Sequence, residues 1–472
     1  MKRILTLSLI ICHLSSTATA KVTLPKFFSD NMVLQQQTDC CLWGTADKGK
    51  TVSVVTSWNN KTYQVKADND GGQWKLKVQT PAAGGPYSIT LNDGEPLTLT
   101  NVLIGEVWIC SGQSNMEMQI KGYKAQPVEG ATEVLLHCTD PMLRLFTVKR
   151  NPQLTPVNDV EGDWNQATTA TVREFSATAY FFGCALRRQL GVPVGLISTA
   201  YGGSACEAWM KADWLRAFPN VQQTVTADDV NKLQQRCPTA LYNGQLAPLI
   251  GYGMRGTIWY QGEDNVPRYD FYAPLFSRMI QGWRDEWQLG DFPFYYCQIA
   301  PYDYTIHDWP IYNSALLREQ QAKVETTVKN CRMAVLIDTG LKDCIHPRKK
   351  QTAGERLAIL ALANTYHVKG LPDFACYSSV EFQGDTAVVS FDRSKEWVYF
   401  ENGPHSPNFE IAGHDRVFHP AKAWINRNRV YVKSDEVKHP VAVRYAFKDW
   451  VVGDLMHDGL PVSSFRTDDW QP

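Results

Sequence analysis

Residues 102–118, VLIGEVWICSGQSNMEM, carry the strongest indication of fold class in the chain. Its first half is mostly apolar, which predicts a strand buried on both faces. Small and polar residues from Cys110 to Gln113 then favour a tight turn, and a helix would begin near Ser114. In open α/β sheets ligands bind where a strand ends and a helix begins, and the helix N-terminus favours a developing negative charge. The sequence therefore predicts Ser114 as a nucleophile, with an ordinary N-cap serine as the alternative.

The chain on either side of this stretch follows two different patterns. Short alternating runs at 51–56, 62–66, 74–78, 87–91 and 97–99 are separated by Gly/Asn/Asp turns and predict an antiparallel sandwich. Further on, apolar strands at 192–198, 256–260, 294–299 and 333–337 alternate with helices at 177–190, 315–328 and 347–363, the last with Pro347 at its first position. Short β runs return after residue 370. We expect a doubly wound, mostly parallel α/β core at 101–369 between antiparallel β modules at 21–100 and 370–472.

The first twenty residues have the pattern of a secretory signal. Lys2 and Arg3 precede an apolar run at 4–11, and Ala18-Thr-Ala20 fits a cleavage site. A secreted or periplasmic protein beginning after Ala20 is expected, and a lipid anchor on Cys12 is less expected because Ile11 precedes it. No other run approaches the ~20 apolar residues of a membrane span.

Net charge bears on the kind of partner, and cysteine content bears on disulfide bonds. Without Lys2 and Arg3 the formal charge changes from −1 to −3, which argues against nucleic acid or an anionic membrane as the main partner. Eleven cysteines follow the leader, so at least one is unpaired within the chain. Most are expected to be buried thiols, and a bridge from Cys206 to Cys237 is our guess for an oxidising compartment.

A serine nucleophile needs a base, and the base needs a partner that fixes its tautomer. His346 follows the predicted strand at 333–337 and precedes a helix, and Asp343 lies three residues before it. One loop would then carry both groups. Asp454 and His457 have the same spacing but fall in the carboxyl-terminal β module. Position therefore favours His346 as base and Asp343 as its orienting acid, and a structural histidine is the alternative.

Two further segments fall where sheet strands should end. Gly202 and Gly203 follow the strand at 192–198, and a glycine N–H there suits an oxyanion. Gln261 and Asn265 follow the strand at 256–260 and offer side-chain amide donors. Glu263 and Asp264 lie between them and are alternatively the paired carboxylates of a glycosidase.

Together these segments resemble the sialate O-acetylesterase family of SGNH hydrolases, which are carbohydrate acetylesterases. The matching text comprises residues 105–116, Tyr201-Gly-Gly-Ser with Glu207-Ala-Trp209, residues 240–244, 258–263 and 292–296, Asp343-x-x-His346-Pro, and residues 465–470. The resemblance spans nearly the whole chain after the leader.

The resemblance implies hydrolysis of acetyl esters on sugar hydroxyls by a Ser114–His346–Asp343 triad, without a cofactor. The sequence has no clustered metal-ligand spacing, so a metal-dependent deacetylase is not expected. It places the oxyanion hole at the Ser114 N–H, at Gly202 or Gly203, and at an amide of Gln261 or Asn265, with Gln261 preferred. It places substrate contacts at Gln113, Asn115, Trp209, Asn243 and Glu263. Asp264 stands where relatives commonly have serine, and we expect it to point outward because a carboxylate would oppose the oxyanion.

Several alternatives stay open at this point. Our first expectation for the substrate is O-acetylated sialic acid, whose carboxylate would need an arginine; Arg255, Arg268 and Arg318 are candidates. Acetylated xylan is the alternative within the same chemistry. A glycoside hydrolase and a non-catalytic glycan-binding protein are the alternatives outside it. The sequence has no His-Glu-x-x-His motif and no Gly-x-Ser-x-Gly elbow at Ser114, and it sets no oligomeric state.

Overall fold

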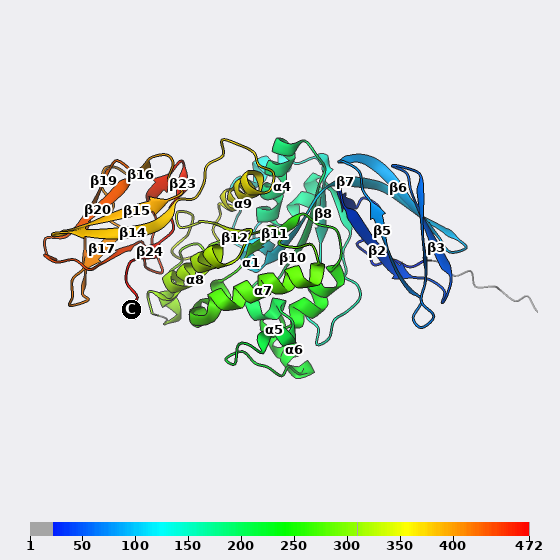
Figure 1. Cartoon of the computed structure of the whole chain (residues 1–472), viewed down its shortest axis with the longest axis horizontal. Helices are drawn as coiled ribbons and strands as arrows, with labels where there is room; N and C mark the ends of the chain where they lie inside the picture. Colours follow the sequence, from blue (N-terminus) through cyan, green and yellow to red (C-terminus); the bar gives the residue numbers. More distant parts are fainter. Residues whose placement is uncertain (1–21, 309, 472) are drawn as a thin grey trace, which may run out of the picture.

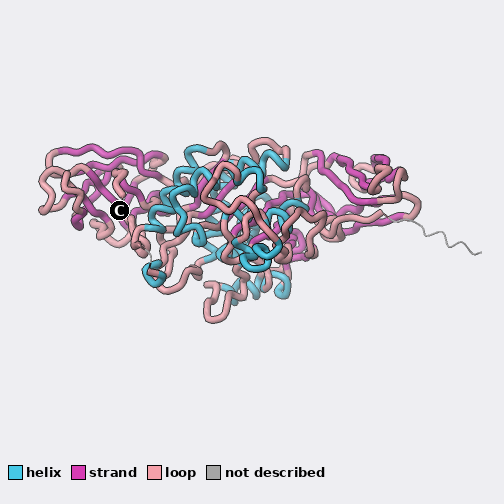
Figure 2. Tube along the Cα trace, turned by 90° about the horizontal axis from the view of Figure 1, so that it is seen from below, coloured by secondary structure: helices cyan, strands magenta, loops and turns pink. Residues whose placement is uncertain are grey.

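The computed structural model describes residues 22–308 and 310–471. It has three parts in a row, with the helices in the middle part and strands at both ends (Figure 2). The predicted signal peptide and Cys12 lie outside the described residues. No helix in the described ranges has the length and apolar content needed to cross a membrane.

Strand β7 (Pro96–Gly112) connects the first two parts. Its first six residues alternate between exposed and partly or fully buried positions, and the last eleven are all buried. The first half pairs antiparallel with β6, and the second half lies between β10 and β11 in the parallel sheet. The expected boundary near residue 100 therefore falls inside one continuous strand.

The middle part is built on a mostly parallel sheet. Its strand order is β13-β12-β11-β7-β10-β8-β9, and only β9 runs antiparallel to its neighbour. The strands are β8 (Asp140–Thr147), β9 (Trp164–Ala167), β10 (Val194–Ala200), β11 (Gly256–Tyr260), β12 (Phe294–Cys297) and β13 (Cys331–Ala334). This confirms the predicted α/β class, and β11 has the predicted bounds.

Helices cover both faces of this sheet (Figure 1). The pair α4 (Ala177–Leu190) and α9 (Lys350–Asn364) covers one face, and the pair α7 (Tyr272–Trp287) and α8 (Asn313–Thr327) covers the other. Helix α4 has the predicted bounds because Ser176 caps its first turn and Gly191 ends it in the left-handed conformation. The smaller helices are α1 (Ser114–Glu117), α2 (Ala131–His137), α3 (Thr169–Arg173), α5 (Ala212–Leu215) and α6 (Ala227–Leu233).

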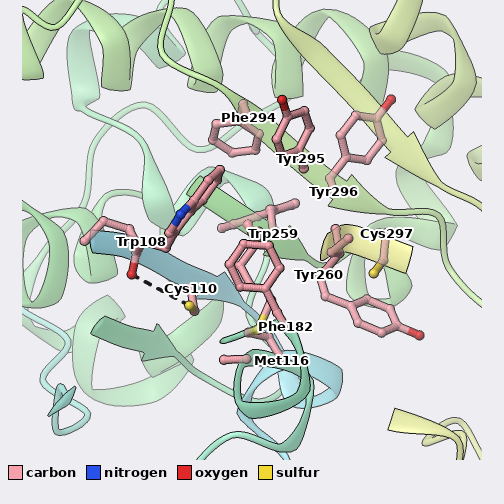
Figure 3. Close-up of a cluster of buried hydrophobic side chains, with 14 of the residues drawn as sticks. Trp108, Cys110, Met116, Phe182, Trp259, Tyr260, Phe294, Tyr295, Tyr296 and Cys297 are labelled. Atoms are coloured by element: carbon pink, nitrogen blue, oxygen red, sulfur yellow. Dashed lines mark hydrogen bonds between the residues drawn. The ribbon is translucent and has the colours of Figure 1, made fainter. Parts of the chain in front are cut away.

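Large aromatic side chains fill the space between the sheet and its helices. Trp108 of β7 packs edge-on against Phe182 of α4, with ring centroids 5.1 Å apart. Figure 3 shows these two residues together with Trp259 and Tyr260 of β11 and the side chains of β12. Aromatic burial on this scale is a major stabilising contribution. It holds in place the strand ends from which the candidate site residues follow.

Strands flank the core on both sides. Before it lie β1 (Val33–Gln35), β2 (Asp39–Thr45), β3 (Thr51–Thr56), β4 (Lys61–Lys66), β5 (Gln73–Gln79) and β6 (Gly84–Asn92). After it lie β14 (Cys376–Gln383), β15 (Thr386–Asp392), β16 (Val398–Phe400), β17 (Phe409–Ala412), β18 (Phe418–Pro420), β19 (Lys422–Asn426), β20 (Arg429–Lys433), β21 (Ala442–Tyr445), β22 (Leu455–His457), β23 (Leu460–Pro461) and β24 (Phe465–Arg466). Pairing within the carboxyl-terminal set is antiparallel.

Two expectations are wrong. Cys206 and Cys237 do not form a bridge, and the eleven cysteines of the described ranges are free thiols. Cys206 instead packs with its Sγ 3.8 Å from the sulfur of Met279. Helix α9 begins at Lys350 rather than at Pro347, because residues 347–349 complete the loop that carries His346.

Candidate active site

The register of three adjacent strands places the candidate segments side by side. Gly112 at the end of β7 is level with Ala200 of β10 and with Tyr260 of β11. The loops that follow these strands therefore begin at the same edge of the sheet. Gly112 has φ +136°, and a Cβ there would lie 2.2 Å from the Tyr260 carbonyl oxygen. Only glycine allows the turn that presents Ser114.

The structure brings Ser114 and His346 together. His346 Nε2 lies 2.9 Å from Ser114 Oγ, within the distance that a general base needs. Both residues line a cavity of about 780 Å³ that opens at this edge of the sheet. Burial, reinforced by the positive charge of Lys350, lowers the pKa of His346 to about 4, so the imidazole is neutral and able to accept a proton at neutral pH.

The other nitrogen of the imidazole contacts Gln126, not Asp343. His346 Nδ1 lies 2.7 Å from Gln126 Oε1, whereas Asp343 is exposed and no hydrogen bond joins it to His346 within the described ranges. A turn positions Gln126, because its backbone exchanges two hydrogen bonds of 3.0 Å with Tyr123. The Tyr123 ring meets the imidazole edge-on at 5.2 Å. The Asp-x-x-His spacing thus does not produce the expected contact, because Asp343 points to solvent.

A carboxylate lies at the glycine turn after β10. The Gly202 N–H donates to Glu117 Oε2 over 2.9 Å, and Arg150 holds the same carboxylate through two hydrogen bonds of 2.7 Å. Arg150 also stacks over the Tyr201 ring at 4.4 Å. The Gly202 donor is therefore engaged. The backbone N–H groups of Gly203 and Ser114 have no partner among the residues described.

The two expected side-chain oxyanion donors lie behind the cavity wall. Gln261 Nε2 donates to the Ser204 carbonyl and to Asn265 Oδ1, and Asn265 Nδ2 donates to Glu207. Both residues are completely buried, and neither lines the cavity. Gln113 does line it. Its Oε1 accepts from the N–H groups of Gly262 and Asp264 at 3.3 and 3.4 Å, which leaves its amide nitrogen without a partner in the described part of the chain.

The expected substrate contacts divide into two groups. Gln113 and Glu263 line the cavity, whereas Asn115, Trp209 and Asn243 do not. Trp209 is buried and donates to Ser204 Oγ. Asn243 holds the loop at 153–154 through two backbone carbonyls. The sequence could not separate buried from cavity-lining members of the same motif.

Asp264 does not point outward as expected. Its side chain is only 6% exposed and pairs with Arg236 at 2.6 Å and with Arg268 at 3.3 Å. These two guanidinium groups compensate its charge in the cavity wall. Glu263 is bound by Asn115, so the two carboxylates serve different partners and do not form the facing pair that a glycosidase needs.

The arginines proposed for a sugar carboxylate lie in different places. Arg268 lines the cavity. Arg255 is paired with Glu106 at 2.7 Å, and Arg318 is completely buried; neither lines the cavity. Arg150 and Arg236 do line it and were not predicted. Within residues 22–308 and 310–471, no three His, Cys, Asp or Glu side chains form a group that could hold a metal ion.

The rival Asp454–His457 pair is structural. His457 accepts the Glu396 N–H at Nε2 and contacts the Asp373 carbonyl through Nδ1. Asp454 accepts from Ser406 and Asn408. Both residues are buried, which agrees with the interpretation from their position.

Comparisons with known proteins agree on one family. The model of the family described as carbohydrate esterase, sialic acid-specific acetylesterase matches residues 104–362. The chain is 27% identical over 424 residues to the sialate O-acetylesterase of Mus musculus, with 77% of each chain covered. It is 28% identical over 381 residues to that of Homo sapiens, with 73% of this chain and 71% of that one covered.

A solved structure extends the likeness to nearly the whole chain. The carbohydrate acetylesterase XAC1771 from Xanthomonas citri is 35% identical and superposes with a TM-score of 0.87. The match covers 95% of this chain and 100% of that one.

Proposed function

The chain belongs to the carbohydrate esterase family of sialic acid-specific acetylesterases, and from this premise we propose that it removes O-acetyl groups from sugars through an acetyl-enzyme on Ser114. It is a carboxylic ester hydrolase with an SGNH-hydrolase-like α/β core. The observation that carries the proposal is the 2.9 Å contact between Ser114 Oγ and His346 Nε2 at the end of β7.

The reaction follows from this contact. Ser114 Oγ attacks the acetyl carbonyl carbon while His346 Nε2 takes the hydroxyl proton. The tetrahedral intermediate collapses, the sugar oxygen leaves with the proton from His346, and the acetyl group remains on Ser114. Water, deprotonated by His346, then attacks the acetyl-serine, and acetate leaves as the proton returns to Ser114 Oγ.

Gln126 is proposed to orient the base. Its Oε1 accepts the Nδ1 proton of His346 over 2.7 Å, which selects the tautomer whose Nε2 lone pair faces Ser114. A neutral amide stabilises the imidazolium of the transition state less than a carboxylate does, since hydrogen bonds between ionised partners are stronger. The triad of this chain would then be Ser114, His346 and Gln126.

The oxyanion is proposed to bind to two backbone donors and one side chain. The N–H groups of Ser114 and Gly203 have no partner in the described residues. Gln113, whose Oε1 is fixed by two backbone N–H groups, would supply the third donor from its amide nitrogen. Preorganised donors of this kind stabilise the developing charge without reorganisation.

The sugar is proposed to be O-acetylated sialic acid, in keeping with the family and with the curated relatives. One observation favours a neutral acetylated sugar, such as acetylated xylan, as the second candidate. Arg150, Arg236 and Arg268 line the cavity, but each is already paired with a carboxylate of this chain. A sugar carboxylate would have to compete for these guanidinium groups.

Export from the cytoplasm is also proposed, and it is supported by the charged, apolar and Ala-x-Ala segments of residues 1–20. N-terminal sequencing of the mature protein should begin at Lys21. Detection of Met1 at the N-terminus of the purified protein would contradict cleavage after Ala20.

Acetate release from O-acetylated sialic acid and from acetylated xylan, measured side by side, tests the proposed function. The wild-type protein should release acetate from at least one of them without producing new reducing ends, and Ser114→Ala should release none while keeping the same melting temperature. Undiminished turnover by Ser114→Ala, or release of reducing sugar, would refute the proposal.

A further inference from the structure

A buried chain of three side chains lies beneath the nucleophile. Asn115 follows Ser114 directly and is completely buried. Its amide nitrogen donates to Glu263 Oε1 over 2.5 Å and to the Ile345 carbonyl over 3.1 Å. Its amide oxygen accepts from the Lys350 ammonium. The amide group of Asn115, in helix α1, thus joins this helix to the segment after β11 and to the loop that carries His346.

The two charged residues fix the orientation of this amide. If the amide were turned over, its NH₂ group would face the Lys350 ammonium, and its oxygen would face the Glu263 carboxylate and the Ile345 carbonyl. A donor cannot pair with an ammonium, and an acceptor cannot pair with a carboxylate. Only one orientation of the Asn115 amide therefore satisfies all of its hydrogen bonds. Lys350, next to the amide oxygen, and Glu263, next to the amide nitrogen, both favour that orientation.

Burying these charges is costly. Lys350 is 1% exposed and Glu263 is 4% exposed, and no direct ion pair joins them within the described residues. Besides Asn115, the ammonium lies 5.7 Å from the centroid of the Tyr260 ring. Glu263 Oε2 has no hydrogen-bond partner in the part of the chain described. Burial lowers the pKa of Lys350 to about 7 and raises that of Glu263.

Stability alone does not account for such a network. Buried ionic groups contribute little to stability compared with well-packed apolar residues of similar volume. The position of the network indicates what it does instead. Asn115 follows Ser114, and Ile345 precedes His346. The hydrogen bond from Asn115 to the Ile345 carbonyl therefore links the same two segments of chain as the 2.9 Å contact between Ser114 and His346.

We propose that Lys350, Asn115 and Glu263 form a positioning network that holds Ser114 Oγ and His346 Nε2 at reacting distance. This inference rests on the proposed function. Asn115 and Lys350 do not line the cavity and touch neither reacting atom, so they act through the two loops that they join. The network should affect the chemical step rather than substrate binding.

Lys350→Met is the first test, because methionine keeps most of the apolar stem and removes the ammonium. We expect kcat to fall about 100-fold, the loss associated with misplacing reacting groups by about 1 Å, with KM unchanged. The matched control is Lys349→Met. Lys349 is the exposed neighbour, and its replacement should leave both constants at the wild-type value.

Asn115→Asp is the second test, because it is isosteric and replaces the amide donors to Glu263 and Ile345 with a carboxylate oxygen, which the Glu263 carboxylate and the Ile345 carbonyl oppose. It should lower kcat to a similar extent, and the double variant should be no slower than the slower single variant, because residues that act as one unit are not additive. If Lys350→Met fails to fold, Asn115→Asp alone decides the question.

The outcome separates this inference from the proposed function. If Ser114→Ala is inactive while folded Lys350→Met and Asn115→Asp keep wild-type kcat, the network inference is refuted and the proposed function stands. A rise in KM with unchanged kcat also refutes it. If Ser114→Ala keeps its turnover, the proposed function itself fails.

Discussion

Replacing Gln126 with alanine should slow the chemical step more than replacing Asp343 with asparagine. Gln126 Oε1 is 2.7 Å from His346 Nδ1 in a half-buried contact. In the proposed mechanism the imidazole becomes an imidazolium in the transition state, and a hydrogen bond to a charged group contributes about 1.5–3 kcal/mol. Its loss should therefore lower kcat by roughly 10- to 150-fold, with little change in KM.

Asp343→Asn is the contrasting variant. The Asp343 side chain is exposed, and a surface substitution changes free energies by about 0.5 kcal/mol or less, which is less than about threefold in rate. Steady-state hydrolysis of a chromogenic acetyl ester by both variants measures the difference. Lys124→Ala, at an exposed position in the same turn as Gln126, is the control for turn integrity. A larger loss of activity in Asp343→Asn than in Gln126→Ala would show that Asp343, and not Gln126, orients the base in the working enzyme.

Three further predictions concern the base, the oxyanion and the carboxyl-terminal module. In the proposed mechanism the neutral imidazole of His346 is the base, and its pKa is lowered to about 4. We therefore expect kcat/KM to stay level below neutral pH and to fall only near pH 4; an acid limb at the ordinary histidine value of about 6.5 would contradict this. Gln113→Leu should lower kcat by about 100- to 1000-fold through loss of one oxyanion donor, and a change within about threefold would exclude Gln113 from that role. Arg444 makes hydrogen bonds of 3.0 and 2.8 Å with Asp468, and both side chains are buried at 4% and 1% exposure. Arg444→Leu should therefore lower the free energy of unfolding in urea by about 3–5 kcal/mol with kcat of the folded protein unchanged, and a loss below about 1 kcal/mol would show that the pair is dispensable.

Local patterns were sufficient to predict most of the fold. The 177–190 helix and the 256–260 strand have the predicted bounds, because a capping serine, a terminal glycine and an unbroken apolar run are local signals. The start of α9 was misjudged because Pro347 is equally suited to the last residues of a loop. Whether a proline starts a helix or ends the preceding loop depends on the path of that loop, which is set by tertiary structure.

The candidate site was predictable only where strand register determines it. Ser114, Gly203 and His346 follow strand ends, and the parallel sheet brings those ends together. Gln126 lies in a polar turn far from any strand end, and glutamine is not a usual partner of a catalytic histidine, so no sequence signal identified it. No sequence signal identified Arg150 and Arg236 either, because nothing in their local sequence distinguishes them from ordinary surface arginines. Gln261 and Trp209 belong to the matching motifs, but their side chains are completely buried, and a motif does not reveal which way a residue faces.

Peptide mapping after rapid acid quench during turnover of an acetylated substrate shows whether Ser114 carries the acetyl group. We expect one added acetyl group on the peptide that contains Ser114, appearing within the first turnover and absent from Ser114→Ala. Acetate release without any acetylated peptide, or with the acetyl group on another residue, would show that Ser114 is not the nucleophile.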